Sequence, residues 1–320
     1  MTDQSTDQPL TAKAVTYKGP GGYEVIEILE RQVRPPADDE VRIEVKAAAV
    51  NPTDLLLRAA GAGDQTSFVV PGMDAAGIIE SVGPGVSRLH PGEEVMAAVM
   101  PRRPEGGAQA QYIVVPAASV VRIPEGVSIA EAATLPMNGL TAFRALELAA
   151  LRKGQCLAVS GGAGLLAHYA IAVAKRQGIK VIADAKPEEA ELVRSYGADV
   201  VIERGSRFAD AVRHALPEGA DALLDTAVLA ESAFGAVRDG GVYIPVRGWG
   251  GKPAERGIRI APVFVVEALE RTEWLEQLRD MVRAAEIRLR VAAEYPLEQI
   301  ADAQRSLEAG GLRGRPVIAF

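Results

Sequence analysis

A glycine-rich segment in the middle of the chain limits the possible folds most strongly. Residues 159–167 read VSGGAGLLA. An apolar stretch at 157–160 leads into this segment, and a helical pattern at 165–177 begins within it and continues beyond it. Within the segment, Gly162, Gly164 and Ala167 match the spacing Gly-x-Gly-x-x-Gly/Ala of the dinucleotide fingerprint. Glycines let the backbone turn tightly and approach an anion, and the following helix offers its positive N-terminus. We therefore predict a strand, a turn and a helix that bind a pyrophosphate; the alternative is a glycine-rich turn without a ligand.

Strands and helices alternate around this turn. Short apolar segments after the turn predict strands at 181–183, 200–202, 222–224 and 242–246. Amphipathic segments predict helices at 188–196, 208–216 and 230–237, and residues 129–150, before the turn, predict one continuous helix. Apolar strands that alternate with amphipathic helices are typical of a parallel sheet covered on both faces. The chain is thus expected to contain an α/β, doubly wound domain of the Rossmann type at 129–265.

The first third of the chain has a different texture. Residues 13–17, 24–29 and 40–45 alternate apolar and polar side chains, as half-buried strands do. Glycine and proline clusters at 19–22 and 35–36 separate these segments and predict turns. This pattern predicts a small β-rich barrel or sandwich that ends near residue 128.

Composition and charge exclude several classes of protein. The formal net charge is −7, and no basic cluster is present that could neutralise a nucleic-acid backbone. No apolar run approaches the roughly 18 residues of a membrane span, and residues 1–10 are polar and expected to form a disordered tail. The single cysteine, Cys156, suits a reducing compartment. We expect a cytoplasmic protein with no nucleic-acid and no membrane partner.

The residues expected to contact a dinucleotide lie at two places. The N–H groups of the glycine-rich turn are expected to bind the pyrophosphate, and its residues are Ser160, Gly161, Gly162, Ala163, Gly164, Leu165 and Leu166. At the tip of the next strand, either Asp184 or Ala185 faces the adenosine ribose, because neighbouring side chains of a strand point to opposite faces. Asp184 there favours NAD, whereas Ala185 there, followed by the cation Lys186, favours NADP, with Arg194 as an additional cation. We predict NADPH; the alternative for Lys186 is a solvated turn lysine.

Several motifs together resemble a known family. They are AVNPTD at 49–54, PGMDAAG at 71–77, VGPGV at 82–86, GGAQAQY at 106–112, LPMNGLTA at 135–142 and the glycine-rich turn. In order and spacing they resemble the quinone oxidoreductase (zeta-crystallin-like) branch of the medium-chain dehydrogenase/reductase superfamily. The resemblance implies a GroES-like catalytic domain at 1–128, an NADP-binding Rossmann domain at 129–265, a segment at 266–320 that completes the catalytic domain, and a homodimer.

The same resemblance implies a metal-free protein. Zinc-dependent relatives bind the metal through cysteine and histidine, and the matching positions here are Asn51, Met73 and Asn138. Zinc prefers thiolate, imidazole or carboxylate ligands, so these three side chains are unsuitable. The three histidines are scattered without metal-like spacing, and His168 is expected to point away from the pyrophosphate.

The resemblance also places candidate residues around the substrate. Asn51 and Asn138 are expected to donate side-chain amide hydrogen bonds to a substrate carbonyl, with loop bracing as the alternative. Asp54 is expected to shape its loop or meet the nicotinamide ribose. Thr141 matches the position beside the nicotinamide ring; the alternative is a hydroxyl at the start of a helix. Leu56 replaces a tyrosine that is common in relatives, which implies protonation of the product by solvent.

The sequence is compatible with two functions. Without a Lewis acid, hydrogen-bond donors suffice when charge spreads into an enolate or a hydroquinone. The chain is therefore expected to be an NADPH-dependent oxidoreductase that reduces quinones or α,β-unsaturated carbonyls. The alternative is a crystallin-like protein that binds NADPH without physiological turnover. Arg313 and Arg315, in a segment that resembles the family's C-terminal ending, are expected to form a solvated basic turn; the alternative is contact with the cofactor phosphate.

Overall fold

The computed structural model describes residues 9–61, 68–253 and 255–320, which form two compact units. The β-rich unit contains Met1–Met137, Leu269–Arg283 and Arg288–Phe320. The Rossmann unit contains Asn138–Ala268 and Ala284–Ile287. The first expected domain boundary, after residue 128, lies nine residues before the division at Met137, because the helix Ile129–Ala132 packs against strands of the β-rich unit.

Two sheets form the β-rich unit. A three-stranded sheet has the order β2-β1-β4, and a seven-stranded sheet has the order β15-β16-β3-β5-β6-β8, with β7 paired to β3. Their strands are β1 Leu10–Lys18, β2 Ile26–Val33, β3 Glu40–Ala49, β4 Phe68–Val69, β5 Asp74–Val82, β6 Glu94–Ala98, β7 Tyr112–Pro116, β8 Val120–Arg122, β15 Val291–Pro296 and β16 Arg315–Ala319. The helices are α1 Pro52–Ala60, α2 Ile129–Ala132, α7 Thr272–Arg283 and α8 Ile300–Glu308, with short 3-10 turns η1 Tyr23–Val25, η2 Ala117–Ser119 and η6 Leu297–Gln299. Antiparallel pairing predominates, and alternate residues such as Val41, Ile43 and Val45 point into one buried core.

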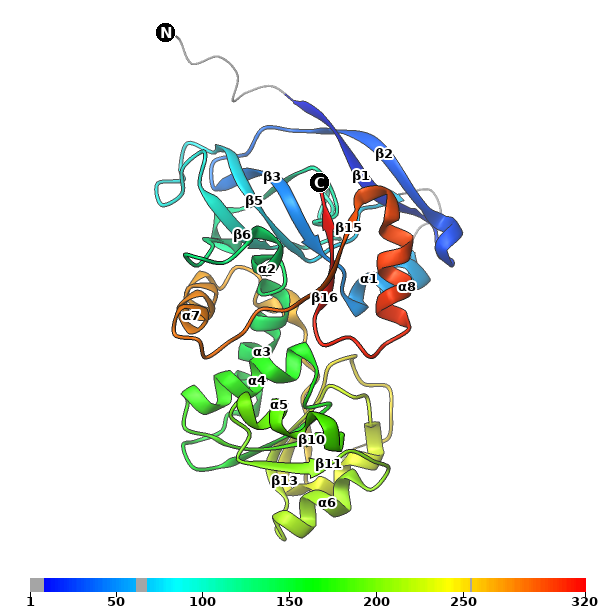
Figure 1. Cartoon of the computed structure of the whole chain (residues 1–320), viewed down its shortest axis with the longest axis vertical. Coiled ribbons are helices and arrows are strands. Elements are labelled where there is room, and N and C mark those ends of the chain that lie inside the picture. The colour runs from blue at the N-terminus through cyan, green and yellow to red at the C-terminus, as the bar shows by residue number, and fades with distance from the viewer. Residues whose placement is uncertain (1–8, 62–67, 254) are drawn as a thin grey trace. The chain divides into compact units, whose positions relative to one another are not determined.

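The Rossmann unit is a single parallel sheet with helices on both sides. Its strand order is β11-β10-β9-β12-β13-β14, and every neighbouring pair is parallel. The strands are β9 Cys156–Ser160, β10 Lys180–Ala185, β11 Val200–Glu203, β12 Ala220–Asp225, β13 Val237–Pro245 and β14 Arg259–Ile260. The helices are α3 Pro136–Ala149, α4 Leu165–Arg176, α5 Ala190–Ser195 and α6 Phe208–Ala215, with 3-10 turns η3 Pro187–Glu189, η4 Ala230–Ala236 and η5 Val265–Glu267. In Figure 1 the green strands β10 and β11 run between α5 and α6. The predicted fold class, a GroES-like β-rich domain plus a Rossmann domain, is confirmed.

Three local expectations differ from the structure. The continuous helix expected at 129–150 is broken into α2 and α3, because a residue before proline avoids the helical conformation and Pro136 suits a first helical turn. The helix expected at 230–237 is the 3-10 helix η4, and Val237 instead begins β13, where it pairs with Ala220. Of the tail expected at 1–10, residues 1–8 lie outside the described part, and Leu10 already begins β1.

No helix in the described part of the chain combines the length and the apolar character needed to cross a membrane.

Candidate functional site

A buried carboxylate, Asp54, ties together the loops at one end of the β-rich unit. It lies in the first turn of α1 and accepts the Asn51 N–H at 2.8 Å and the Gly72 N–H at 3.0 Å. The side-chain amide of Gln109 donates to it at 3.2 Å. Gly72 has a φ of 101°, and a Cβ there would lie 2.8 Å from the backbone nitrogen of Gln109. The close approach of these two segments therefore requires glycine at position 72. Asp54 therefore fixes the relative positions of three separate segments.

A second buried carboxylate, Asp74, lies at the start of β5. The Asn51 side-chain amide donates to Asp74 at 2.7 Å, and the Met137 N–H, in the first turn of α3, donates to it at 2.5 Å. A carboxylate is favourable at a helix N-terminus, where N–H groups lack partners within the helix. Asp74 is not among the site residues predicted from the sequence. Its signal was an acidic residue inside the otherwise apolar segment MDAAG at 73–77.

Asn51 bridges Asp74 and a cation from the other end of the chain. Its side-chain oxygen accepts a hydrogen bond from Nε of Arg315 at 2.8 Å, and its amide nitrogen donates to Asp74. The expectation of a solvated turn is therefore wrong for Arg315, which belongs to β16 and is only partly exposed. With both ends of its amide engaged and no exposed surface, Asn51 has the geometry of the bracing alternative. Its contact with a substrate carbonyl stays a prediction.

Burial dominates the acid–base properties of the two carboxylates. It raises the pKa of Asp54 to about 7, against the opposing effect of the N–H donors and Arg315. Burial likewise raises the pKa of Asp74 to about 7, and the negative charge of Asp54 adds to the increase. The pair can thus gain or lose a proton near neutral pH.

The other candidate residues of this region divide between the units. Asn138 and Thr141 lie three residues apart on α3, so they share one face of the helix, and both are buried. Met73 is also buried, whereas the Leu56 side chain is 48% exposed. The roles of Asn138 and Thr141 toward a substrate or a nicotinamide ring stay predictions.

In the Rossmann unit, the glycine-rich turn follows β9 as the sequence predicts. Gly161 has a φ of 74°, and a Cβ on Gly162 would lie 2.5 Å from the Asp184 carbonyl oxygen, so glycine is needed at both positions. A Cβ on Gly164 would approach only the Gly161 carbonyl oxygen, at 3.1 Å. The space beside Gly164 is therefore otherwise open.

Three N–H groups of this turn are used by the fold itself. The Gly161 and Gly162 N–H groups donate to the side-chain carboxylate of Asp184, and the Gly164 N–H donates to the Gly161 carbonyl at 2.8 Å. Asp184, 22 residues beyond Gly162, reaches the turn through the pairing of β9 with β10. Contact of these three glycines with a pyrophosphate stays a prediction.

The start of α4 provides the remaining donors. The N–H groups of Leu165, Leu166 and Ala167 precede the first hydrogen bond of the helix, from His168 to Gly164, and make no hydrogen bond within the described residues. Together with the open space beside Gly164, they fit a pyrophosphate group. The N–H groups of Leu165 and Leu166 would hold the pyrophosphate. The N-terminus of α4 is therefore the part of the turn that fits a dinucleotide.

Asp184, and not Ala185, faces the glycine-rich turn. Its second carboxylate oxygen pairs with Nε of Arg204 at 2.9 Å, and the side chain is only 5% exposed. Ala185 is buried, and Lys186 is exposed at the start of the following turn. Arg194 pairs with Glu191 on α5. Of the two alternatives at this strand tip, the structure turns Asp184 toward the glycine-rich turn, while contact of Ala185 and Lys186 with a nucleotide stays a prediction.

Ser160 is also engaged within the unit. Its hydroxyl donates to Asp225 at 2.6 Å and accepts the Ala227 N–H at 3.0 Å. The same Asp225 accepts the Tyr243 hydroxyl at 2.6 Å, and burial together with this hydrogen bond raises the pKa of Tyr243. This network ties the carboxyl ends of β9, β12 and β13 together, and sequence reasoning did not find Asp225.

His168 faces the interior of the Rossmann unit. Its ring stacks on that of Tyr196 with 4.0 Å between the centroids and an angle of 22° between the planes. The side chain is buried, so it lies away from the open terminus of α4, as expected.

No group of three or more histidine, cysteine, aspartate or glutamate side chains in the described ranges has the geometry of a metal site. The positions matched to zinc ligands carry Asn51, Met73 and Asn138, and the amide of Asn51 is engaged by Asp74 and Arg315. The side chains present do not fit a zinc ion.

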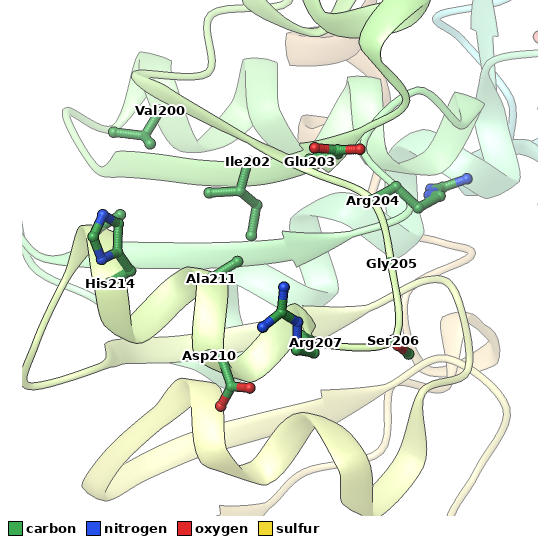
Figure 2. A pocket seen from close by; sticks show the side chains of 11 residues that line it. Val200, Ile202, Glu203, Arg204, Gly205, Ser206, Arg207, Asp210, Ala211 and His214 are labelled. Atoms are coloured by element: carbon green, nitrogen blue, oxygen red, sulfur yellow. The ribbon is translucent and has the colours of Figure 1, made fainter.

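A groove follows the free edge of β11. Figure 2 shows Ile202 on its strand side and Ala211 and His214 on α6. The Arg207 side chain points into the groove, whereas the Arg204 guanidinium is directed away from His214. Both arginines line the groove, Arg204 just after β11 and Arg207 at the start of α6.

Comparisons with known proteins agree with this architecture. Residues 37–125 match the alcohol dehydrogenase GroES-like domain, and residues 196–318 match the family described as zinc-binding dehydrogenase. The chain is 32% identical to the 2-methylene-furan-3-one reductase of Solanum lycopersicum, over 99% of this chain and 81% of that protein. It is 30% identical to the NADPH-dependent alkenal/one oxidoreductase, chloroplastic, of Arabidopsis thaliana, over 97% of this chain and 80% of that protein.

A solved structure has the same fold. The quinone oxidoreductase from Coxiella burnetii superposes with a TM-score of 0.81 over 97% of this chain and 100% of that chain. The sequence identity is 22%, so this likeness concerns the fold alone.

Proposed function

This chain belongs to the medium-chain dehydrogenase/reductase superfamily, and we propose that it transfers hydride from NADPH to a quinone or an α,β-unsaturated carbonyl. The observation that carries the proposal is the open N-terminus of α4 beside Gly164 in a Rossmann unit. The relatives named as a furanone reductase and an alkenal/one oxidoreductase support the acceptor class.

Each unit has a separate task in this reaction. NADPH, when bound, supplies the hydride from its nicotinamide ring. The N–H groups of Leu165 and Leu166 hold the pyrophosphate, and Thr141 lies on the helix proposed to flank the nicotinamide ring. In the β-rich unit, Asp54 and Asp74 hold Asn51 in one orientation, which limits the loop at 51–54 to one conformation.

The acceptor determines what the protein must stabilise. Hydride adds to the β-carbon of an enone, the electron pair of the double bond moves toward the carbonyl oxygen, and a proton completes the saturated ketone. Side-chain amides of Asn51 or Asn138 are proposed to stabilise the enolate oxygen. Leu56 offers no proton, so water is proposed to protonate the carbon.

The proposal is tested by following NADPH oxidation with matched acceptors. We expect oxidation with a 2-alkenal, an enone and a quinone, and little with the saturated aldehyde of the same length. Treatment with a chelator should leave these rates unchanged, because no metal takes part in the proposed reaction. Oxidation of the saturated aldehyde at an equal rate would contradict the acceptor class.

Two further outcomes separate the alternatives. Binding of NADPH without oxidation by any acceptor favours the crystallin-like alternative, a binding protein without turnover. If calorimetry detects no binding of NADPH or NADH, the assignment of the α4 terminus to a pyrophosphate is wrong.

A further inference from the structure

An ion pair joins the carboxyl ends of β10 and β11. Nε of Arg204 lies 2.9 Å from Oδ2 of Asp184. The backbone N–H of Arg204 donates to the Ala185 carbonyl at 2.8 Å. The side chain of Asp184 is 5% exposed, whereas that of Arg204 is 35% exposed. At the end of these strands, the Asp184 carboxylate is therefore buried, whereas the Arg204 guanidinium is partly exposed to solvent.

Asp184 has little capacity left to bind a ribose. One of its carboxylate oxygens accepts the N–H groups of Gly161 and Gly162, and the other accepts Nε of Arg204. These donors occupy a side chain that is almost fully buried, and Arg204 balances its charge. Asp184 thus anchors the glycine-rich turn and cannot serve as an outward-facing acid that repels a 2′-phosphate.

Arg204 still has donors to offer. Only its Nε is engaged by a side chain, and its two terminal amino groups make no hydrogen bond with any residue in the described ranges. A guanidinium is planar and binds phosphate oxygens through two parallel hydrogen bonds. Because Asp184 fixes Nε, the terminal amino groups are held in position before a ligand arrives.

The place of Arg204 suits the adenosine end of a dinucleotide. In a doubly wound sheet the ligand lies beyond the carboxyl ends of the strands, and the ribose hydroxyls lie at the tip of the strand that follows the glycine-rich turn. Here that strand is β10, and Arg204 directly follows the neighbouring strand β11, which pairs with β10 up to Ala185 and Glu203.

We infer that Arg204 binds the 2′-phosphate of NADPH and thereby sets the preference of this chain for NADPH over NADH. The inference rests on the proposed function and names a residue for its cofactor choice. It assigns the main cationic contact to Arg204, with Lys186 as a solvated neighbour. Arg194 is held by Glu191, and Arg207 points into the groove beside α6 (Figure 2).

The test compares the dissociation constants of NADPH and NADH, measured by calorimetry, for single variants of the full chain. Arg204→Ala should weaken NADPH about tenfold or more, because two charge-assisted hydrogen bonds are lost. NADH, which has no 2′-phosphate, should change less than about twofold. Arg207→Ala is the matched control, a cation of the same loop, and should leave the ratio of the two constants unchanged.

A conservative variant guards against loss of folding. Arg204→Lys keeps a positive charge beside Asp184 but lacks the planar fork, so the thermal midpoint should hold while part of the NADPH preference is lost. Adenosine 2′,5′-bisphosphate and AMP, used as probes, should repeat the difference between NADPH and NADH without any turnover.

The outcomes separate this inference from the proposed function. If the wild-type chain binds neither nucleotide, the proposed function and the inference both fail. If it binds both and the ratio is unchanged in Arg204→Ala and Arg204→Lys, only the inference is overturned. An equal loss of NADPH affinity in Arg204→Ala and Arg207→Ala also overturns it, because it would show a general effect of positive charge.

Discussion

At the scale of single residues, the structure places two acidic side chains where water cannot reach them. Asp54 and Asp74 are both buried, yet each accepts N–H donors from segments that are distant in the sequence. Hydrogen bonds favour the charged form of a carboxylate and desolvation opposes it, and here desolvation is the larger effect. The two carboxylates therefore titrate close to neutral pH.

This balance predicts how stability depends on pH. An acid whose pKa is about 7 when folded and about 4 when unfolded binds more protons in the folded state between these values. The stability of the β-rich unit should therefore decrease as the pH rises from about 4 to about 7. Asp74→Asn removes one of the two groups, so its thermal midpoint should decrease less steeply over this range, even if it is lower at every pH.

An exposed acid provides the control for this measurement. Glu30→Gln changes a side chain on the surface of β2 and should leave the slope of the wild-type profile unchanged. Parallel profiles of the wild type and Asp74→Asn would show that the Asp74 carboxyl does not titrate in this range.

At the scale of elements, the glycine-rich turn combines two requirements that the sequence pattern does not separate. Gly162 is required by the fold, because a Cβ at this position would collide with the backbone of Asp184. Gly164 borders open space at the start of α4, where a side chain would occupy the space proposed for the ligand. The motif alone attributes both glycines to pyrophosphate binding.

Alanine variants distinguish the two requirements. Gly162→Ala should destabilise the Rossmann unit by about 1–3 kcal/mol, because the backbone of β10 must move to admit the methyl group. Gly164→Ala should cost clearly less stability and instead weaken the binding of NADPH. Chemical denaturation and calorimetry measure the two effects, and equal destabilisation by both variants would refute the distinction.

At the scale of the whole molecule, the free edge of the Rossmann sheet at β14 is proposed to join a second copy of the chain. The described part of β14 has only two residues and pairs with β13 alone. Phe264 and Val266 follow it and are 49% and 48% exposed, an unusual degree for apolar side chains next to a sheet edge.

Removing the apolar character of this edge should separate the copies. We expect the wild-type chain to have twice its mass of 33.7 kDa by light scattering, and Phe264→Glu combined with Val266→Glu to have the single mass. Leu192→Glu, on the exposed face of α5, is the control and should keep the wild-type mass. A wild-type chain that is monomeric at all concentrations would rule out the homodimer.

The type and order of the main elements could be predicted from the amino-acid pattern alone. Apolar strands at 157–160 and 181–183 and the glycine-rich turn between them were placed correctly, because burial on both faces of a parallel sheet leaves a continuous apolar pattern. Residues 129–150 were less accurate, because the apolar pattern continues through Pro136 and hides the break between α2 and α3.

Which polar groups form hydrogen bonds with one another could not be predicted before the folded structure was known. Asn51 and Arg315 are 264 residues apart, Asp74 and Met137 are 63 apart, and Asp184 and Arg204 are 20 apart, yet each pair forms a hydrogen bond. Strand pairing and burial bring these groups together, and neither leaves a local pattern in the sequence. For this reason the sequence located the glycine-rich turn, and the structure showed that Asp184 closes it from within and that Arg204 remains outside.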